Sequence, residues 1–337
     1  MQLLRLGPTR FTQLAWENLA RKHALQIVST EATNRAQFIN ELKSGKFSNV
    51  SYLTRTFESF AQTGKLDTEL LDLFKKFTNI KAISHNGAGY DQVDADYCGK
   101  LNIQLSNVPN LVDDATADTA AYLILSTMRN FHIGNVNMIN GKWPGEKCAG
   151  TPIGNDPKGK KLAILGMGGI GRAIRDRMKP FGFEIYYYNR NKLSPELENG
   201  AIYCNSKEEL FKLADILSIS IPLNEATKHC IDKNSINLMK DGVIIINTAR
   251  GPVINEYDLK IALKNNKVGA FGSDVWDNEP NVDLEFAHMP NVVALPHLGT
   301  HSVETMTAME EFVIENVSHY LETGRVKTMV PELKNLF

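Results

Sequence analysis

The chain has 337 residues, a length that fits two domains of about 100–200 residues each. Its 37 Lys and Arg residues nearly balance 38 Asp and Glu residues, which gives no electrostatic reason to expect nucleic acid or an anionic membrane as a partner. The longest strongly apolar uncharged run, residues 119–128, is far shorter than the ~20 residues of a membrane helix. We therefore expect partners that are small molecules or copies of the chain itself.

The amino terminus shows no cationic start followed by an apolar core and a small-residue cleavage site, so secretion is not expected. The four cysteines, Cys98, Cys148, Cys204 and Cys230, are scattered without CxxC spacing and are interpreted as reduced thiols. A metal site is not expected, because HExxH and metal-binding Cys/His spacings are absent. These observations indicate a cytoplasmic protein.

Short apolar runs alternate with amphipathic stretches along the chain, the pattern of an α/β fold with parallel sheets. The amino-terminal part is predicted to form a smaller open α/β domain, with candidate strands at residues 3–6, 25–28, 50–53, 82–84 and 103–105. A boundary is expected near Pro109, because turn residues there precede a long helical period capped by Asp113 or Asp114.

The second part of the chain predicts six buried parallel strands with covering helices. The candidates are residues 162–165, 185–188, 216–221, 243–246, a run near Ala270, and 292–295. A long helix over residues 302–322 would then return the chain to the first domain. We therefore expect a discontinuous domain of residues 1–108 and 300–337, and a second domain of residues 109–299.

A glycine-rich turn, GMGGIG, lies between the first strand of the second domain and the helix that follows it. This context is typical of a dinucleotide site, since the glycines permit a tight turn, close approach of the pyrophosphate and close helix packing. The alternative is a tight turn that binds no nucleotide. The candidate cofactor-binding residues are Gly166, Met167, Gly168, Gly169, Ile170 and Gly171.

The end of the next strand bears on which nucleotide binds. An NAD site usually has Asp or Glu here, whereas this chain has Asn189 and Arg190, with Lys192 two residues later. An Arg can bind a 2′-phosphate through a planar fork of donors, so NADPH is favoured, with NADH possible. The alternative is that both cations are solvated loop charges.

Three polar residues follow strands of the second domain in distinctive settings: Arg250 in NTARGPV, Glu279 in SDVWDNEP and His297 in LPHLGTHS. They should meet at the carboxyl edge of the sheet, where ligands bind in doubly wound folds. This set suits the reduction of a 2-keto acid. The cation can bind the substrate carboxylate, the imidazole can donate a proton, and the carboxylate can orient the imidazole. Each residue alone is more often a structural polar group or part of a salt bridge, and the prediction depends on all three occurring in their motifs.

Seven blocks make the chain resemble the D-isomer-specific 2-hydroxyacid dehydrogenases, most closely the glyoxylate and hydroxypyruvate reductase branch. They are residues 85–94, 114–130, 166–171, 220–229, 246–256, 272–280 and 295–302. The resemblance implies a Rossmann-type doubly wound sheet for the cofactor and a smaller flavodoxin-like α/β substrate domain, with an active site between them. It also implies a homodimer built through the cofactor domains, and hydride transfer between nicotinamide C4 and substrate C2.

The resemblance also implies residue roles. Arg250 would bind the substrate carboxylate and polarise the keto oxygen, His297 would act as acid and base, and Glu279 would orient His297. The turn of Asn86, Gly87, Ala88 and Gly89 would bind the substrate, with backbone N–H groups of Ala88 and Gly89 on the carboxylate and Gly87 allowing its close approach. His85 and Asn86 stand where the family often has an apolar residue. The further cofactor neighbours would be Thr116, Pro222, Thr227, Thr248, Ala249, Asp274 and Gly299.

Substrate size stays open at this point. Selectivity would depend on the turn at Gly87, on the segment around Arg55, and on Trp143 of the partner subunit. The favoured function is NADPH-dependent reduction of glyoxylate or hydroxypyruvate to a D-2-hydroxy acid. The alternatives are a dehydrogenase of bulkier branched or aromatic 2-hydroxy acids, and a nucleotide-sensing binding protein that resembles corepressors of the same fold.

Overall fold

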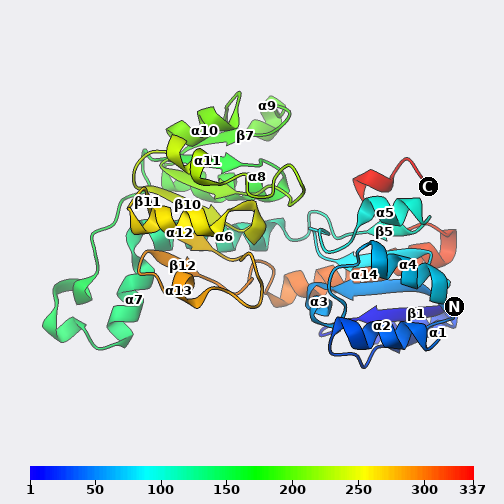
Figure 1. The fold of residues 1–337 in the computed structure, drawn as a ribbon. Coiled ribbons are helices and arrows are strands. Elements are labelled where there is room, and N and C mark those ends of the chain that lie inside the picture. The colour runs from blue at the N-terminus through cyan, green and yellow to red at the C-terminus, as the bar shows by residue number, and fades with distance from the viewer. The chain divides into compact units, whose positions relative to one another are not determined.

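The computed structural model describes residues 1–337, and the chain divides into two compact units. Unit 1 comprises Met1–Val112 and Ser302–Phe337, and unit 2 comprises Asp113–His301. Each unit has its own parallel sheet, covered by helices (Figure 1). No helix combines the length and the apolar character needed to cross a membrane. The predicted α/β class with two parallel sheets is confirmed.

Unit 1 contains a five-stranded sheet of order β2-β1-β3-β4-β5. The chain winds from β1 to β2 on one side and then crosses to β3 on the other, so the strand order reverses between β1 and β3. All five strands lie where the apolar runs predicted them. They are β1 (Gln2–Leu6), β2 (Gln26–Ser29), β3 (Val50–Thr56), β4 (Ala82–Asn86) and β5 (Gln104–Ser106).

The two faces of this sheet differ in character. On one face Leu53 packs with Phe38, Leu42 and Phe74 in the main apolar core of the unit, and burial of each such side chain contributes roughly 1.5–3 kcal/mol. The helices of the unit are α1 (Gln13–His23), α2 (Arg35–Lys43), α3 (Phe60–Thr63), α4 (Thr68–Phe77), α5 (Ala95–Lys100) and α14 (Val303–Thr323).

The other face is more polar and lies against α14. Tyr52 stacks edge-on against Tyr320 of α14, and its hydroxyl lies 2.7 Å from the Ser84 hydroxyl, which in turn lies 2.6 Å from that of Ser106. Burial raises the pKa of Tyr52, so this hydroxyl stays protonated. Polar side chains therefore extend into the interior of unit 1.

Unit 2 contains a seven-stranded sheet of order β12-β11-β10-β9-β6-β7-β8, the doubly wound arrangement with its reversal between β6 and β9. Six strands match predicted runs, and β8 was missed because two residues, one of them exposed, carry no recognisable period. The strands are β6 (Lys161–Leu165), β7 (Glu184–Tyr188), β8 (Ile202–Tyr203), β9 (Ile216–Ile219), β10 (Val243–Asn247), β11 (Val268–Ser273) and β12 (Val292–Ala294).

Helices cover both faces of this sheet. One core cluster joins it to α6 and α8, and another joins it to α10, α11 and α12. Asp113 and Asp114 lie inside the first turn of α6, so the prediction that one of them caps the helix is wrong. Their negative charges still stabilise the helix, because they lie at the positive end of its dipole. The helices of the unit are α6 (Asp113–Arg129), α7 (Phe131–Ile139), α8 (Gly169–Met178), α9 (Pro195–Glu198), α10 (Lys207–Leu213), α11 (Lys233–Leu238), α12 (Glu256–Lys264) and α13 (Leu284–Ala287).

The segment from α7 to β6 extends away from the sheet of its own unit (Figure 1). Short 3₁₀ helices occupy Trp143–Gly145 and Lys147–Gly150 within it. Large apolar side chains are exposed along this arm, which we define as residues 131–159. They are Phe131, Val136, Met138, Ile139, Trp143 and Ile153.

Candidate active site

The three predicted catalytic side chains follow three adjacent strands of unit 2. Arg250 follows β10, Glu279 lies in the loop after β11, and His297 follows β12. Because these strands are parallel neighbours, all three loops leave the same edge of the sheet. The edge therefore gathers a guanidinium, a carboxylate and an imidazole.

Glu279 and His297 form a direct pair. His297 Nδ1 lies 2.8 Å from Glu279 Oε2, and both side chains are mostly buried, with 27% and 18% of their areas exposed. The second oxygen, Oε1, accepts a 2.7 Å hydrogen bond from the Trp276 backbone N–H. Since both oxygens of Glu279 are used, the carboxylate is fixed, and it fixes the imidazole plane in turn. His297 itself has a left-handed backbone, with φ of +56°.

The Arg250 loop is held by its own backbone contacts. The fully buried Asn247 side chain donates from Nδ2 to the Arg250 carbonyl at 2.9 Å and accepts from the Ala249 N–H at 3.0 Å. Arg250 is half-buried, and its Nη1 donates to the Ala249 carbonyl at 2.8 Å. A Cβ at Gly251 would meet the Trp276 carbonyl carbon at 1.9 Å, so only glycine permits this close approach.

Asp274 ends the β11 segment and is buried. Its two oxygens accept backbone N–H groups of Leu298 at 2.6 Å and Gly299 at 2.7 Å. Burial raises the pKa of Asp274, while these N–H groups and nearby His297 act in the opposite direction. A Cβ at Gly299 would lie 3.1 Å from Asp274 Oδ2 and 3.7 Å from Thr116. Thr116, Asp274 and Gly299, three predicted cofactor neighbours, therefore lie together.

The glycine-rich turn connects β6 to α8. Gly166 has φ of +97°, and a Cβ there would meet the Ser220 carbonyl at 2.5 Å, while a Cβ at Gly171 would meet the Gly166 carbonyl at 2.2 Å. Gly168, by contrast, faces open space. Gly169 and the half-buried Ile170 begin α8, so the turn presents its backbone at the positive end of a ten-residue helix.

The end of β7 lacks a carboxylate. Asn189 Oδ1 accepts the Met167 N–H at 2.6 Å, so its side chain faces the glycine-rich turn. Arg190 is exposed, and Lys192 lies 3.7 Å from Glu198, a long ion pair. This edge of the turn is therefore cationic and solvent-accessible.

Two further loops supply polar groups. The Thr248 hydroxyl, after β10, and the Ser220 hydroxyl, after β9, are buried without a hydrogen-bond partner in the chain. Thr227 donates to the Pro222 carbonyl at 2.7 Å and so shapes the loop after β9. Open space at Gly168 and orphaned hydroxyls along the same sheet edge fit a bound dinucleotide.

In unit 1 the predicted substrate turn follows β4. The Gly87 carbonyl accepts the Val108 N–H at 2.9 Å, and the Ala88 carbonyl accepts Asn107 Nδ2 at 2.7 Å. The turn is therefore held through its carbonyl oxygens, whereas the N–H groups of Ala88 and Gly89 make no hydrogen bond within the chain. A peptide oriented in this way offers donors to an anion.

Two residues of the β3 and β4 ends support this turn. His85 is buried, and its Nε2 would lie 2.7 Å from a Cβ at Gly87, so a larger residue there would require the imidazole to move. Arg55 is 1% exposed and donates to the Gln92 carbonyl at 3.0 Å and to Gln92 Oε1 at 2.7 Å. Burial lowers the pKa of Arg55 to about 10, while the charge of Asp91 opposes that shift. Its guanidinium thus ties β3 to the segment after the turn.

Comparison with known proteins assigns the family. The sequence profile of the D-isomer specific 2-hydroxyacid dehydrogenase NAD binding domain matches residues 121–299. The chain belongs to this family. It is 47% identical to glyoxylate reductase 1 of Saccharomyces cerevisiae, over 99% of this chain and 95% of that protein. It is therefore an NAD(P)-dependent D-2-hydroxyacid dehydrogenase.

Two other relatives extend over nearly the whole length. The chain is 40% identical to 4-methyl-2-oxopentanoate reductase A of Aspergillus oryzae, with 99% of each protein covered. A solved glyoxylate reductase from Paecilomyes thermophila superposes with a TM-score of 0.92 at 39% identity, with 99% of each chain covered. The resemblance seen in the sequence blocks is confirmed at the level of family and branch.

Within this dehydrogenase, two positioning residues were missed from sequence. Asn247 holds the Arg250 loop, and Trp276 contacts Gly251, donates its backbone N–H to Glu279 and donates its indole N–H to the Leu295 carbonyl at 2.9 Å. Each lies inside a motif already singled out, NTARG or SDVW, which was the available signal. Their contacts join loops that are distant in sequence.

Proposed function

We propose that this dehydrogenase reduces small 2-keto acids, glyoxylate and hydroxypyruvate, to D-2-hydroxy acids with NADPH as the preferred cofactor. The bound nicotinamide would supply the hydride that reaches substrate C2. The observation that carries the proposal is the 2.8 Å pair of Glu279 and His297 at the sheet edge that also holds Arg250. Reduction needs one proton at the keto oxygen, and this pair is built to deliver it.

His297 would act as the acid. Its Nδ1 is engaged by Glu279, so proton delivery to the developing alkoxide falls to Nε2. Glu279 would keep the ring oriented through the step and stabilise the imidazolium before transfer, as an acidic partner does in other His-dependent sites. In the oxidative direction, the same nitrogen would accept the proton.

Arg250 would bind the substrate carboxylate and polarise the keto oxygen. A guanidinium offers paired donors in a planar fork and stays charged, so it can serve both oxygen-bearing groups. The N–H groups of Ala88 and Gly89 would add neutral donors to the carboxylate, with Gly87 allowing close approach and Asn86 leading into the turn. These interactions orient C2 and stabilise negative charge as it develops on the keto oxygen.

The cofactor assignment rests on the end of β7. Asn189 is bonded to the glycine-rich turn, and exposed Arg190 follows it, with Lys192 nearby. The lack of a carboxylate removes repulsion toward a 2′-phosphate, and Arg190 would bind that phosphate. Asp274, Thr248 and Ala249 would contact the nicotinamide half of the cofactor. NADH remains usable because these contacts and those of the glycine-rich turn do not involve the 2′-phosphate.

Arg190→Ala tests this preference. We expect the KM for NADPH to rise about tenfold, the value of one charge-assisted hydrogen bond, while the KM for NADH stays near the wild-type value. Steady-state kinetics with both nucleotides measures this, and Lys43→Ala provides a control at an exposed cation on α2 of unit 1. Equal use of both nucleotides by the wild type would count against the preference.

A homodimer is also proposed. Ile139 and Ile153, 76% and 99% exposed, lie with Trp143 on the arm of residues 131–159, and contiguous exposed apolar side chains mark association surfaces. Sedimentation analysis should give a dimer for the wild type and a shift toward monomer for Ile139→Glu. The four cysteines form no disulfide, which suits the cytoplasmic location that we propose.

A second candidate function is reduction of bulkier branched or aromatic 2-keto acids, which the name of the Aspergillus oryzae relative favours. Purified enzyme should be assayed with glyoxylate, hydroxypyruvate, 4-methyl-2-oxopentanoate and phenylglyoxylate, each with NADPH and NADH. The highest kcat/KM is expected for one of the two small acids with NADPH. A higher value for either bulky acid would replace the first proposal with the second.

A further inference from the structure

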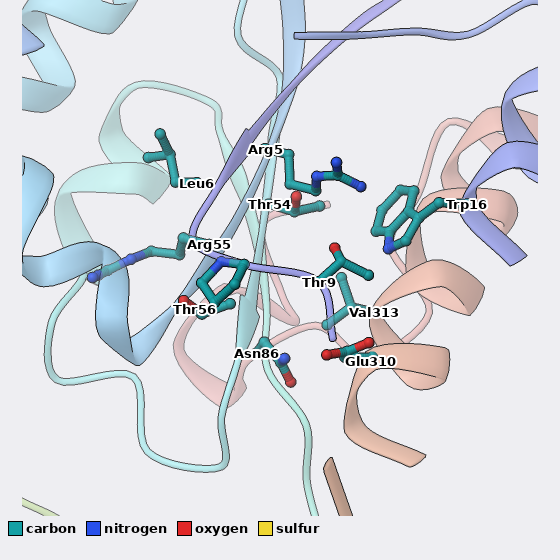
Figure 2. A pocket seen from close by; sticks show the side chains of 11 residues that line it. Arg5, Leu6, Thr9, Trp16, Thr54, Arg55, Thr56, Asn86, Glu310 and Val313 are labelled. Carbon is teal, nitrogen blue, oxygen red and sulfur yellow. The ribbon is translucent and has the colours of Figure 1, made fainter. Parts of the chain in front are cut away.

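A small cavity in unit 1 lies at the carboxyl ends of β1 and β3 (Figure 2). Its lining includes Leu6 at the end of β1, Thr56 at the end of β3, Asn86 at the end of β4, and Glu310 of α14. The strand order of this sheet reverses between β1 and β3, and ligands of open α/β sheets bind at such a reversal. The cavity therefore occupies the place where this fold forms a binding crevice.

Three polar atoms in the cavity lining have no hydrogen-bond partner within the chain. They are Oγ1 of Thr54, Oγ1 of Thr56 and Oδ1 of Asn86, and each atom is buried. Thr56 and Asn86 are paired neighbours on β3 and β4, and Thr54 lies two residues before Thr56, so all three belong to one face of the sheet. Buried polar atoms are almost always hydrogen-bonded, so three orphans in one cavity indicate a polar ligand group.

The charges around the cavity favour a neutral group. The Glu310 carboxylate accepts N–H groups of Arg10, Phe11 and Thr12 at 2.9–3.1 Å, which fixes a negative charge in one wall. Arg55 extends from β3 in the direction opposite to Thr54 (Figure 2) and is committed to Gln92. Arg5 lies in the same lining and is attracted to Glu310, so the two charges offset each other. A substrate carboxylate therefore gains no net attraction there, whereas a hydroxyl would meet acceptors and donors alike.

The cavity is also small. Its volume is about 20 Å³, on a scale where one water-sized group needs about 10–15 Å³. A hydroxyl fits, and a branched or aromatic side chain does not. Asn86 directly precedes Gly87, in the turn proposed to bind the substrate carboxylate, so the cavity lies one residue from that turn.

We infer that this cavity binds the C3 hydroxyl of a 3-hydroxy-2-keto acid and so selects that substrate class, an inference that rests on the proposed function. The hydroxyl donates to Asn86 Oδ1 and accepts from the Thr56 hydroxyl, which pairs two of the orphaned atoms. A site that hydrogen-bonds a substrate hydroxyl discriminates against an analogue that carries a methyl group there, because its polar atoms are then left unpaired.

Thr56→Val tests the inference, because it keeps the shape of the side chain and removes the hydroxyl. Hydroxypyruvate and 2-oxobutanoate differ only by hydroxyl against methyl at C3, and glyoxylate has no C3. We expect kcat/KM for hydroxypyruvate to fall about fivefold to tenfold, the value of about one hydrogen bond, while glyoxylate changes by less than about twofold. Thr78→Val is the matched control, since Thr78 is buried and bonded to the Phe74 carbonyl, outside the cavity lining.

If Thr56→Val leaves the ratio of kcat/KM for hydroxypyruvate to kcat/KM for 2-oxobutanoate unchanged, the inference is overturned and the cavity is assigned to ordered water. The proposed function stays intact in that case if glyoxylate is still reduced. Absence of turnover by the wild type with every keto acid would instead refute the proposed function. Calorimetric titration with D-glycerate and D-2-hydroxybutanoate gives a readout without turnover. Tighter binding of D-glycerate by the wild type, reduced in Thr56→Val, supports the inference, and equal binding of the two acids overturns it.

Discussion

The catalytic groups at the carboxyl edge of unit 2 and the cavity groups of unit 1 differ in how their polar atoms are satisfied, although the Thr248 and Ser220 hydroxyls of unit 2 also lack partners. In unit 2, both oxygens of Glu279, both oxygens of Asp274 and both polar atoms of the Asn247 side chain have partners within the chain. In unit 1, Thr54, Thr56 and Asn86 each have a buried polar atom with none. Groups that move protons and bind charge must be in place before the substrate arrives, whereas groups that recognise a substituent can be completed by it.

Replacement of His297 by Gln should have the largest effect. The amide keeps hydrogen-bonding capacity but cannot exchange a proton near neutral pH, so kcat for glyoxylate reduction should fall about 10²–10⁴-fold. Cofactor affinity, measured by fluorescence titration, should stay within about threefold of the wild type, because His297 is assigned no cofactor contact. If His297→Gln retained more than a tenth of the wild-type kcat, the His297–Glu279 pair would not be the source of the proton.

Arg250→Lys should have the next largest effect. The substitution keeps the charge and loses the planar fork, so kcat/KM for both small keto acids should fall about 10- to 100-fold. Steady-state kinetics measures this, and exposed Arg325→Lys is the control, for which no change is expected. An equal loss in both variants would mean that the bidentate geometry is irrelevant.

Trp276→Phe tests whether the order in unit 2 depends on contacts between loops. Phe keeps most of the packing against Phe271 and Phe286 but removes the indole hydrogen bond to the Leu295 carbonyl. The free energy of unfolding should fall by about 1 kcal/mol in urea titrations, with a decrease in kcat of a few fold. Tyr257→Phe, at a 74% exposed position on α12, should leave kcat unchanged.

Thr54→Val should have the smallest effect and tests the other side of the comparison. Because the Thr54 hydroxyl has no partner in the chain, its removal should leave the free energy of unfolding unchanged or raise it by up to about 1 kcal/mol. Thr78→Val removes the hydrogen bond from the Thr78 hydroxyl to the Phe74 carbonyl and should lower the free energy of unfolding by about 1 kcal/mol. Similar destabilisation in both variants would show that the two classes of threonine do not differ.

Much of the fold could be predicted because buried parallel strands have continuous apolar runs, as in VIII at residues 243–246. The candidate catalytic residues could be placed on one sheet edge because each follows such a run. The contacts that hold them could not be predicted. The Trp276 indole meets Leu295 across 19 residues and Arg55 meets Gln92 across 37, and such pairings depend on how loops pack.

The cavity of unit 1 could not be predicted from the sequence either, because segments that are distant in the chain form its walls. The period of β3 identifies Thr54 and Thr56 as members of one face, but it does not show that their hydroxyls lack partners. One wall comes from Glu310, about 300 residues from the loop that it binds. Only the folded chain brings these groups together.

The Glu310 contact can form only late in synthesis of the chain. The carboxylate that binds the backbone of residues 10–12 is translated after all of unit 2, so the first 112 residues leave the ribosome without α14, which packs on their polar sheet face. At about 5–20 residues per second, residues 113–301 take roughly 10–40 s to translate. During that interval the amino-terminal sheet lacks one of the helices that pack on this face, and the Glu310 contacts of residues 10–12 cannot form.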